Sequence, residues 1–368
     1  MNDAALSNPR NDQLRWLVFV IASIGVLGAS AAAGDSPTAT VSENRFGKVF
    51  QLTNGPKTDE DGSFIGGDDG KIYFAFISNR SGNMDVWLTS SKDGQQWSEP
   101  HAVVATPHDD LLNVFTRTSD GIYHLTGRSQ FMVADSTSSN LVEWSAPVAW
   151  SNPRTDGWTA GSFQEAAHGE YWLVTLSEKT GVRKLYIQNS SDRGRNWSAR
   201  APLTQHEQAD FLFSFRIAAD GTFILVWEQR DVRDQKTLVS ASSNIYASTS
   251  KDGIKWTAPA LLSPPTGKPK LDMWPSIIVG PRDQYYAVWM SSRVATPESP
   301  GGAVMVPVYP RLDAADLRAV PASGYSVRSQ RLADGRFLLA WVQKTKTNPT
   351  LDYYYRIVAD FEFDPVKR

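Results

Sequence analysis

The stretch DGKIYFAFISNR, from Asp69 to Arg80, is the first of six similar segments in this chain. Each copy consists of a turn, usually Asp-Gly, followed by a short run of aromatic and β-branched residues and then by polar residues. The other five copies read DGIYHLTGRSQ, HGEYWLVTLSEK, DGTFILVWEQR, DQYYAVWMSSR and DGRFLLAWVQK. Counted between their turn positions, the copies are 51, 48, 52, 63 and 51 residues apart; these positions are Gly70, Gly121, Gly169, Gly221, Gln284 and Gly335.

The pattern of these copies predicts an all-β fold. Each apolar run is hydrophobic on both faces, as a strand must be when its sheet is covered on both sides, and each run follows a tight turn. A repeat of about 50 residues with several short strands per repeat is typical of a β-propeller. We therefore expect a six-bladed β-propeller of four-stranded antiparallel blades over residues 45–368, in which residues 45–53 close the ring by pairing with the last blade.

A second repeat lies out of phase with the first. The segment SSDRGRNW, residues 190–197, has the pattern Ser-x-Asp-x-Gly-x-x-Trp. Shorter forms occur at residues 91–97 and 250–256, and a degenerate form with Asn140 in place of the Asp occupies residues 138–144. In such a turn the Asp accepts hydrogen bonds from backbone N–H groups, the Gly adopts a positive φ and the Trp packs on the sheet. These boxes are expected to be scaffold and not active site.

Together the two repeats resemble the sialidase superfamily of six-bladed propellers with Asp-box (BNR) repeats, and the resemblance covers residues 45–365. It implies a glycoside hydrolase with a Tyr nucleophile, a Glu partner, an Asp acid/base and three Arg that bind the substrate carboxylate. The segment GYSVRSQRLADGRFLLAW, residues 324–341, looks like the family's nucleophile region and places Tyr325 at that position. The family's Phe/Tyr-Arg-Ile-Pro motif is replaced by TDEDGSFIGGDDG, residues 58–70, so the sialidase set is incomplete.

The innermost strand of each blade should begin about ten residues before the turn position of each copy and should line the axis. Acidic and aromatic residues converge there, and such mixtures bind sugars because rings stack on pyranose faces while carboxylates bind hydroxyls and perform acid and base catalysis. The alternative is that they cap turns or pack between blades. The residues at these positions are Glu60, Asp61, Leu111, Leu112, Trp158, Asp210, Asp272, Trp274 and Tyr325. The catalytic candidates are Tyr325, Asp61, Glu60, Asp210 and Asp272.

A basic residue ends the apolar run of every copy, and this ring of positive charge could face an acidic sugar because guanidinium groups bind carboxylates bidentately. The alternative is that these side chains are solvated strand ends. The six residues are Arg80, Arg128, Lys179, Arg230, Arg293 and Lys344. The substrate-binding candidates are Arg80, Arg230 and Arg293, together with Trp158 and Trp274.

The first 33 residues read as a targeting segment. Arg10 and Arg15 precede the apolar run from Trp16 to Gly28, and small residues follow at the expected cleavage site. The alternative is an uncleaved membrane anchor. Residues 34–44 read as a linker. Either way we expect the bulk of the chain to be exported, secreted or periplasmic, with contact to a membrane only if the segment is retained.

Composition excludes several other functions. A net charge of -2, with evenly spread charges, offers no footprint for nucleic acid, and the absence of cysteine excludes disulfides, Cys-ligated zinc and thiol nucleophiles. The five His show no metal-ligand spacing, and we expect no metal and no cofactor. The sequence therefore predicts an exported propeller that acts on carbohydrate, as a glycoside hydrolase of unknown substrate. A non-catalytic glycan- or protein-binding propeller is the alternative.

Overall fold

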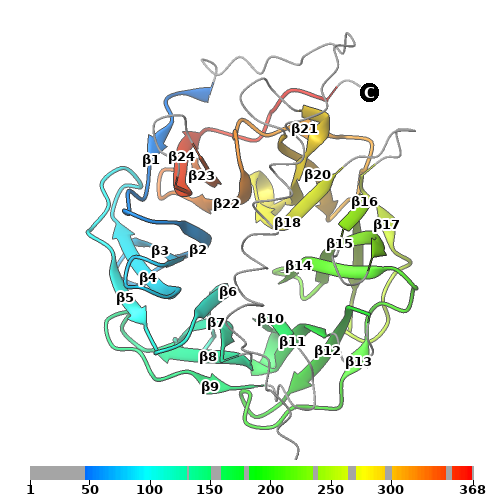
Figure 1. Cartoon of the computed structure of the whole chain (residues 1–368), viewed down its shortest axis with the longest axis horizontal. Coiled ribbons are helices and arrows are strands. Elements are labelled where there is room, and N and C mark those ends of the chain that lie inside the picture. Colours follow the sequence, from blue (N-terminus) through cyan, green and yellow to red (C-terminus); the bar gives the residue numbers. More distant parts are fainter. Residues whose placement is uncertain are drawn as a thin grey trace, which may run out of the picture.

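A computed structural model describes residues 46–130, 132–150, 159–177, 182–234, 239–263, 271–294, 301–344 and 350–366. Six four-stranded antiparallel sheets surround a central axis, so the predicted six-bladed propeller is confirmed (Figure 1). The segments predicted to be a targeting sequence and a linker, residues 1–33 and 34–44, lie outside the described residues. Within the described part of the chain, no helix has both the length and the apolar character needed to cross a bilayer.

Each blade runs from an inner strand to an outer edge strand. Blade one consists of β2 (Asp59–Gly66), β3 (Ile72–Ser78), β4 (Asp85–Ser91) and β5 (His101–Val104). Blade two consists of β6 (Asp110–Arg117), β7 (Tyr123–Ser129), β8 (Met132–Ser138) and β9 (Val148–Ala149). Blade three consists of β10 (Thr159–Glu165), β11 (Tyr171–Ser177), β12 (Lys184–Ser190) and β13 (Ala201–Pro202).

The second half of the ring repeats this order. Blade four consists of β14 (Ala209–Ile217), β15 (Phe223–Asp234), β16 (Val239–Ser250) and β17 (Ala260–Leu261). Blade five consists of β18 (Asp272–Val279), β19 (Tyr285–Ser291), β20 (Gly302–Tyr309) and β21 (Arg318–Ala319). Blade six consists of β22 (Tyr325–Arg331), β23 (Phe337–Gln343), β24 (Asp352–Val358) and, at its edge, β1 (Phe50–Gln51).

The N-terminal strand closes the ring, as the sequence predicted. Phe50 lies opposite Tyr355 and Gln51 opposite Tyr354 in the antiparallel pair of β1 and β24. The rings of Phe50 and Tyr355 also stack, with 5.4 Å between their centroids. The edge of the last blade is thereby paired with a strand from the other end of the chain, which joins blades one and six without a disulfide.

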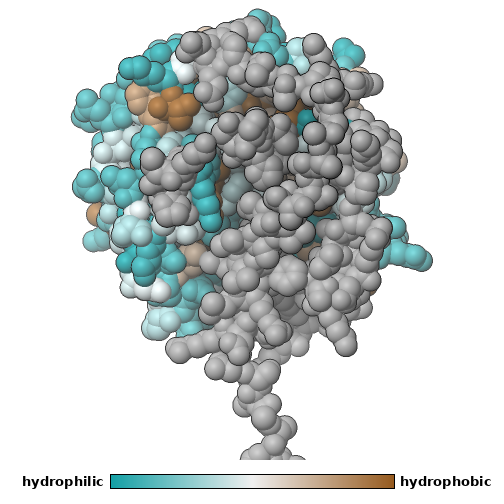
Figure 2. Space-filling model, turned by 45° about the horizontal axis from the view of Figure 1, so that its top comes forward, coloured by the Kyte–Doolittle hydropathy of each residue, from teal (hydrophilic) through white to brown (hydrophobic). Residues whose placement is uncertain are grey.

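The six apolar runs of the sequence form the second strand of each blade. All seven residues of β11 are buried, and the indole rings of Trp227, Trp289 and Trp341 fill the equivalent strands of blades four to six. Their burial on both faces follows from the position of these strands between neighbouring sheets. Outside, most described residues on the face in Figure 2 are hydrophilic.

The four Asp-boxes make the turns that the sequence predicted. In blade one the Ser91 hydroxyl accepts a hydrogen bond from the Gly94 N–H at 2.9 Å, and Asp93 accepts from the N–H groups of Gln95 and Gln96. Asn140 replaces the Asp in blade two and accepts the same pair of backbone bonds through its amide oxygen, each at 2.9 Å. An amide oxygen therefore suffices for this turn, and the degenerate box is a functional scaffold element.

In each box that contains a Gly, this Gly packs against residues of the preceding blade. Gly253 of blade four has a φ of +71°, and a Cβ placed on it would lie 2.6 Å from the Trp172 ring of blade three. We expect Gly253→Ala to destabilise the fold by about 1–3 kcal/mol, through both the positive φ and the clash. Thermal or urea unfolding measures this, and Gly221→Ala is the control because it has a positive φ and open space around its Cβ. Equal losses in the two variants would contradict a role for the packing on Trp172.

Candidate functional site

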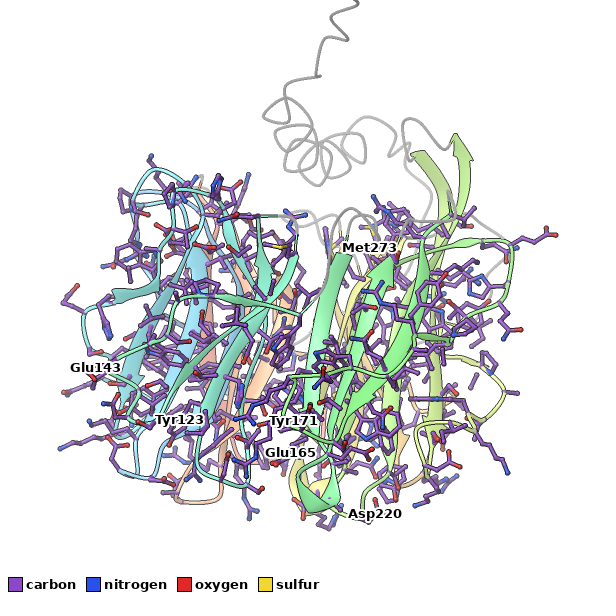
Figure 3. All side chains as sticks on the ribbon, turned by 90° about the horizontal axis from the view of Figure 1, so that it is seen from below. Tyr123, Glu143, Glu165, Tyr171, Asp220 and Met273 are labelled. Carbon is purple, nitrogen blue, oxygen red and sulfur yellow. The ribbon has the colours of Figure 1, made fainter. Side chains whose placement is uncertain are left out.

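The candidate site lies where the inner strands begin, which we name the mouth end of the ring. Met273 marks this end in Figure 3, while Asp220 and Glu165 lie at the opposite end. Five of the six inner strands contain a register shift a few residues after their start. Such a bulge bends the strand and redirects the side chains next to it. The repeated bulge is the local reason why several polar and aromatic side chains meet at the mouth end.

Glu60 and Asp61 are adjacent residues of β2 at its bulge. Asp61 has a φ of 48°, a left-handed conformation that interrupts the alternation of side chains along an ordinary strand. Burial raises the pKa of Glu60 to about 8, with the charge of Asp61 adding to the rise and Lys344 opposing it. At neutral pH Glu60 is therefore mainly protonated, which is unusual for a carboxyl group.

Asp61 is an exposed residue when its backbone and side chain are taken together. The protein packed around the carboxyl group raises its pKa above the usual range, and the Arg328 guanidinium acts in the opposite direction. Two backbone contacts fix this bulge: Gly62 N–H donates to the Tyr353 hydroxyl, and Arg328 Nε donates to the Gly62 carbonyl at 2.6 Å. Blade six thus holds the acids of blade one in place.

Tyr325 begins β22 and, like Glu60 in the neighbouring blade, immediately precedes the bulge of its strand. Its ring stacks on Trp274 of blade five, with 4.4 Å between centroids. The hydroxyl group is buried and has no hydrogen-bond partner among the described residues. Burial raises the pKa of Tyr325 well above its usual value, and the charges of Glu60 and Asp61 raise it further. Tyr325 is therefore close to both acids, but its oxygen is not open to a ligand in this conformation.

Trp274 occupies the bulge of β18 with a φ of 56°. Its backbone N–H donates to Glu228 Oε2 of blade four at 3.3 Å. Glu228 is fully buried and also pairs with Arg230. A charged group that anchors the backbone of a strained residue fixes the direction of its side chain, so Glu228 positions Trp274 at the mouth end.

The other predicted acids lie in structural contacts of their own blades. Asp272 accepts hydrogen bonds from Trp289 Nε1 at 2.9 Å and from Arg293 at 3.2 Å, and it is 1% exposed. Asp210 is fully buried, with His206 Nε2 3.0 Å from its carboxylate. Neither carboxylate joins Glu60 and Asp61. The alternative that these two cap strand starts therefore agrees with their contacts, and we leave them out of the proposed site.

The predicted binding arginines are likewise paired. Arg80 donates to both carboxylate oxygens of Asp59, at 2.9 and 2.8 Å. This ion pair of blade one corresponds to the pair between Arg293 and Asp272 in blade five. Arg230 pairs with Glu228 and lies 3.9 Å from the centre of the Phe211 ring. These contacts neutralise all three guanidinium groups. Trp158 and Lys179 lie outside the described residues.

Sequence reasoning missed three residues that shape the site: Glu228, Arg328 and Tyr353. Glu228 differs from its neighbours in being an acid inside an apolar run, which is a signal that a buried partner exists. Arg328 follows Tyr325 in the segment that resembles the sialidase nucleophile region, yet nothing in that spacing indicates that it reaches blade one. Tyr353 contacts Gly62 across 291 residues of sequence, and no local pattern indicates such a pair.

Comparisons with known proteins bear on the fold. No protein-family model matches the chain, and no curated protein matches it in sequence. A protein of unknown function from Dyadobacter fermentans is similar in structure at 14% identity, with 85% of this chain and 99% of that chain covered and a TM-score of 0.64. An α-L-arabinofuranosidase of family GH93 from Fusarium graminearum gives 14% identity, 85% and 98% coverage and a TM-score of 0.60.

The intramolecular trans-sialidase from Ruminococcus gnavus is also similar, at 10% identity, with 91% of this chain and 100% of that chain covered and a TM-score of 0.55. Sialidases and arabinofuranosidases of this kind are six-bladed propellers, and so is this chain. The likeness predicted from the repeats is therefore confirmed at the level of architecture: the chain has a sialidase-like six-bladed β-propeller fold.

Proposed function

We propose that this protein is a glycoside hydrolase that uses Glu60 and Asp61 at the mouth end of the propeller. The observation that carries the proposal is the pair of neighbouring carboxyl groups, one of which has a pKa of about 8 while the other belongs to an exposed residue and experiences the positive charge of Arg328. Most glycoside hydrolases use one protonated and one ionised carboxyl group beside the same glycosidic bond. The glycosidase neighbours in the structural comparison support the reaction class of this proposal.

In this scheme Glu60 donates its proton to the glycosidic oxygen as the bond to the anomeric carbon breaks. Asp61 supplies the carboxylate on the side of the anomeric carbon, where it attacks directly or takes a proton from the attacking water. In either case water ends as the hydroxyl group of the released sugar, and the second proton of water restores the acid. Arg328 favours the ionised form of Asp61, because it lowers the pKa that burial raises.

Trp274 and Tyr325 form an aromatic wall beside the acids. Aromatic rings of this kind bind the apolar faces of sugar rings, and they also exclude water from a neighbouring carboxyl group. Because Arg80, Arg230 and Arg293 are neutralised by Asp59, Glu228 and Asp272, we propose a neutral sugar as substrate and not a sialoside. The N-terminal apolar segment supports the further proposal that the enzyme acts outside the cytoplasm.

The test is a panel of fluorogenic glycosides, including arabinofuranosides and sialosides, with the purified protein and its Tyr325→Phe variant. We expect turnover of a neutral glycoside that survives in Tyr325→Phe within about tenfold, since the carboxyl groups carry the chemistry. Loss of turnover in a variant that still folds would instead assign the reaction to the Tyr325 hydroxyl.

A glycan-binding protein without catalysis is the second candidate, because the same wall and acids can bind a sugar without cleaving it. A glycan array separates the two. Binding of a sugar that is weakened by Trp274→Ala, without turnover of that sugar by the unaltered protein, would replace the enzyme proposal with this one.

A further inference from the structure

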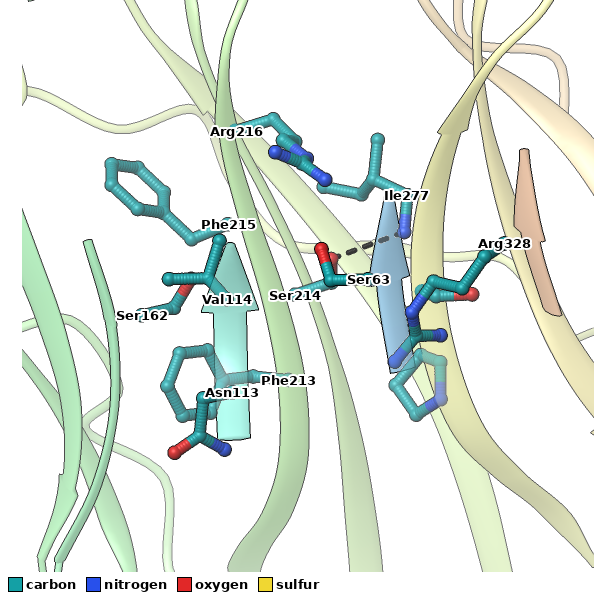
Figure 4. A pocket seen from close by; sticks show the side chains of 12 residues that line it. Ser63, Asn113, Val114, Ser162, Phe213, Ser214, Phe215, Arg216, Ile277 and Arg328 are labelled. Carbon is teal, nitrogen blue, oxygen red and sulfur yellow. Dashed lines mark hydrogen bonds between the residues drawn. The ribbon is translucent and has the colours of Figure 1, made fainter. Parts of the chain in front are cut away.

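A small cavity lies on the axis of the ring, deeper than the mouth end. Its volume is about 60 Å³, and all six inner strands contribute to its wall. Figure 4 shows Arg216 of β14 and Arg328 of β22 on two sides of this cavity, with Ser63 and Ser214 between them. No Asp or Glu is among the described residues that line it. The cavity is therefore a small polar space with a positive wall.

The two guanidinium groups affect each other. Burial lowers the pKa of Arg216, and the charge of Arg328 lowers it further. Arg328 uses Nε and Nη1 for the carbonyl groups of Gly62 and Val327, whereas the Arg216 side chain forms no hydrogen bond or ion pair with another described residue. Both arginines are half-buried residues. A partly desolvated positive charge without a partner is destabilising, and a second charge of the same sign increases that cost.

Two serine hydroxyl groups in the wall, those of Ser63 and Ser214, remain available as donors, whereas Ser276 Oγ donates to the Val327 carbonyl at 2.8 Å. Ser214 Oγ accepts a hydrogen bond from the Ile277 N–H at 3.1 Å, and Ser63 Oγ accepts one from the Phe115 N–H at 3.4 Å. Each hydroxyl group already accepts from the backbone, so its own O–H remains to be donated. Neither O–H has an acceptor among the described residues. The wall thus offers two charged donors and two neutral donors.

We propose that this cavity binds a small inorganic anion such as chloride, held by Arg216 and Arg328 with help from Ser63 and Ser214. A space of this volume can hold an anion of one to three atoms together with water, but it is too small for a sugar ring. The anion supplies the negative charge and the acceptor that the wall lacks. The site lies on the axis and is distinct from the acid pair of the mouth end, although Arg328 contributes to both.

The test is the melting temperature at constant ionic strength, with sodium chloride replacing sodium gluconate. We expect Tm to rise saturably by about 2 °C or more as chloride fills the site. In Arg216→Met the rise should disappear, because one of the two charged groups that bind chloride is lost. Removal of one of two neighbouring positive charges can itself raise Tm, so the readout is the response to chloride and not the Tm alone. Arg331→Met, at the exposed end of β22, should keep the full response.

Crystals grown in sodium bromide provide the direct check, since bromide has an anomalous signal. We expect a peak between Arg216 and Arg328 in the unaltered protein and none in Arg216→Met. A cavity that holds water only, or a chloride response equal in Arg216→Met and the unaltered protein, would overturn the proposal. Neither readout depends on enzymatic activity, so the proposed glycosidase and the anion site can fail independently.

Discussion

Replacement of Glu60 by Gln is expected to lower kcat by about 100- to 10,000-fold at neutral pH, because glutamine cannot donate a proton to the leaving oxygen. Gln keeps the size and much of the polarity of the side chain, so the bulge of β2 and the aromatic wall should persist. Steady-state kinetics on the best glycoside of the panel measures the loss. Glu143→Gln is the matched control, since Glu143 is exposed within the Asp-box of blade two.

The pH profile of the unaltered enzyme makes the same assignment independently. Glu60 must be protonated to act as an acid, so kcat/KM should be retained below its pKa of about 8 and fall above it. On the acidic side the rate should fall as Asp61 becomes protonated, at a pH above the usual range for aspartate. A profile without the basic limb, or Glu60→Gln turning over like Glu143→Gln, would remove Glu60 from the reaction.

Stability provides a second readout for the same variant. Between pH 4.5, the ordinary pKa of Glu, and about 8, the folded protein binds a proton at Glu60 that the unfolded chain has released. The free energy of unfolding should therefore fall as pH rises through this window. Glu60→Gln lacks this effect, so its Tm relative to the unaltered protein should be higher at pH 8 than at pH 5. An equal difference at both pH values would contradict the raised pKa.

The fold could be predicted from the sequence because the repeats depend on interactions between residues that are close in the chain. The turn at Gly70, the two apolar faces of the run that follows and the backbone bonds of Asp93 depend only on neighbouring residues. The same counting located the starts of the inner strands, and with them Glu60, Asp61, Trp274 and Tyr325. Ring closure was predictable as well, since an unassigned strand at one end must pair somewhere.

The sequence did not separate functional charges from structural ones. Arg80 pairs with Asp59 and Arg293 pairs with Asp272, in each case within one sheet and at a separation of 21 residues. This common spacing is a sequence signal of structural pairing. The contact of Glu228 with Trp274 spans two blades, and that of Gly62 with Tyr353 spans the ring closure. Such pairs depend on the assembled ring, because no local pattern along the chain relates the two residues.

Replacement of Asp61 by Asn should affect both the reaction and its neighbour. Turnover is expected to fall by about 100-fold or more, because the carboxylate that acts at the anomeric carbon is lost. The negative charge of Asp61 also raises the pKa of Glu60, so its removal should lower that pKa below about 8. The basic limb of the residual activity should then move to lower pH, which a sensitive fluorogenic substrate can detect.

The control for this shift is Asp69→Asn in the turn between β2 and β3, where the carboxylate is exposed and bonds only to its own turn and to Tyr73. That variant should leave the basic limb unchanged, because its charge is screened by solvent and lies away from Glu60. A basic limb that stays near pH 8 in Asp61→Asn would mean that burial alone sets the pKa of Glu60. A shift in both variants would trace the effect to net charge. A shift in Asp61→Asn alone ties the two carboxyl groups into one acid and base pair.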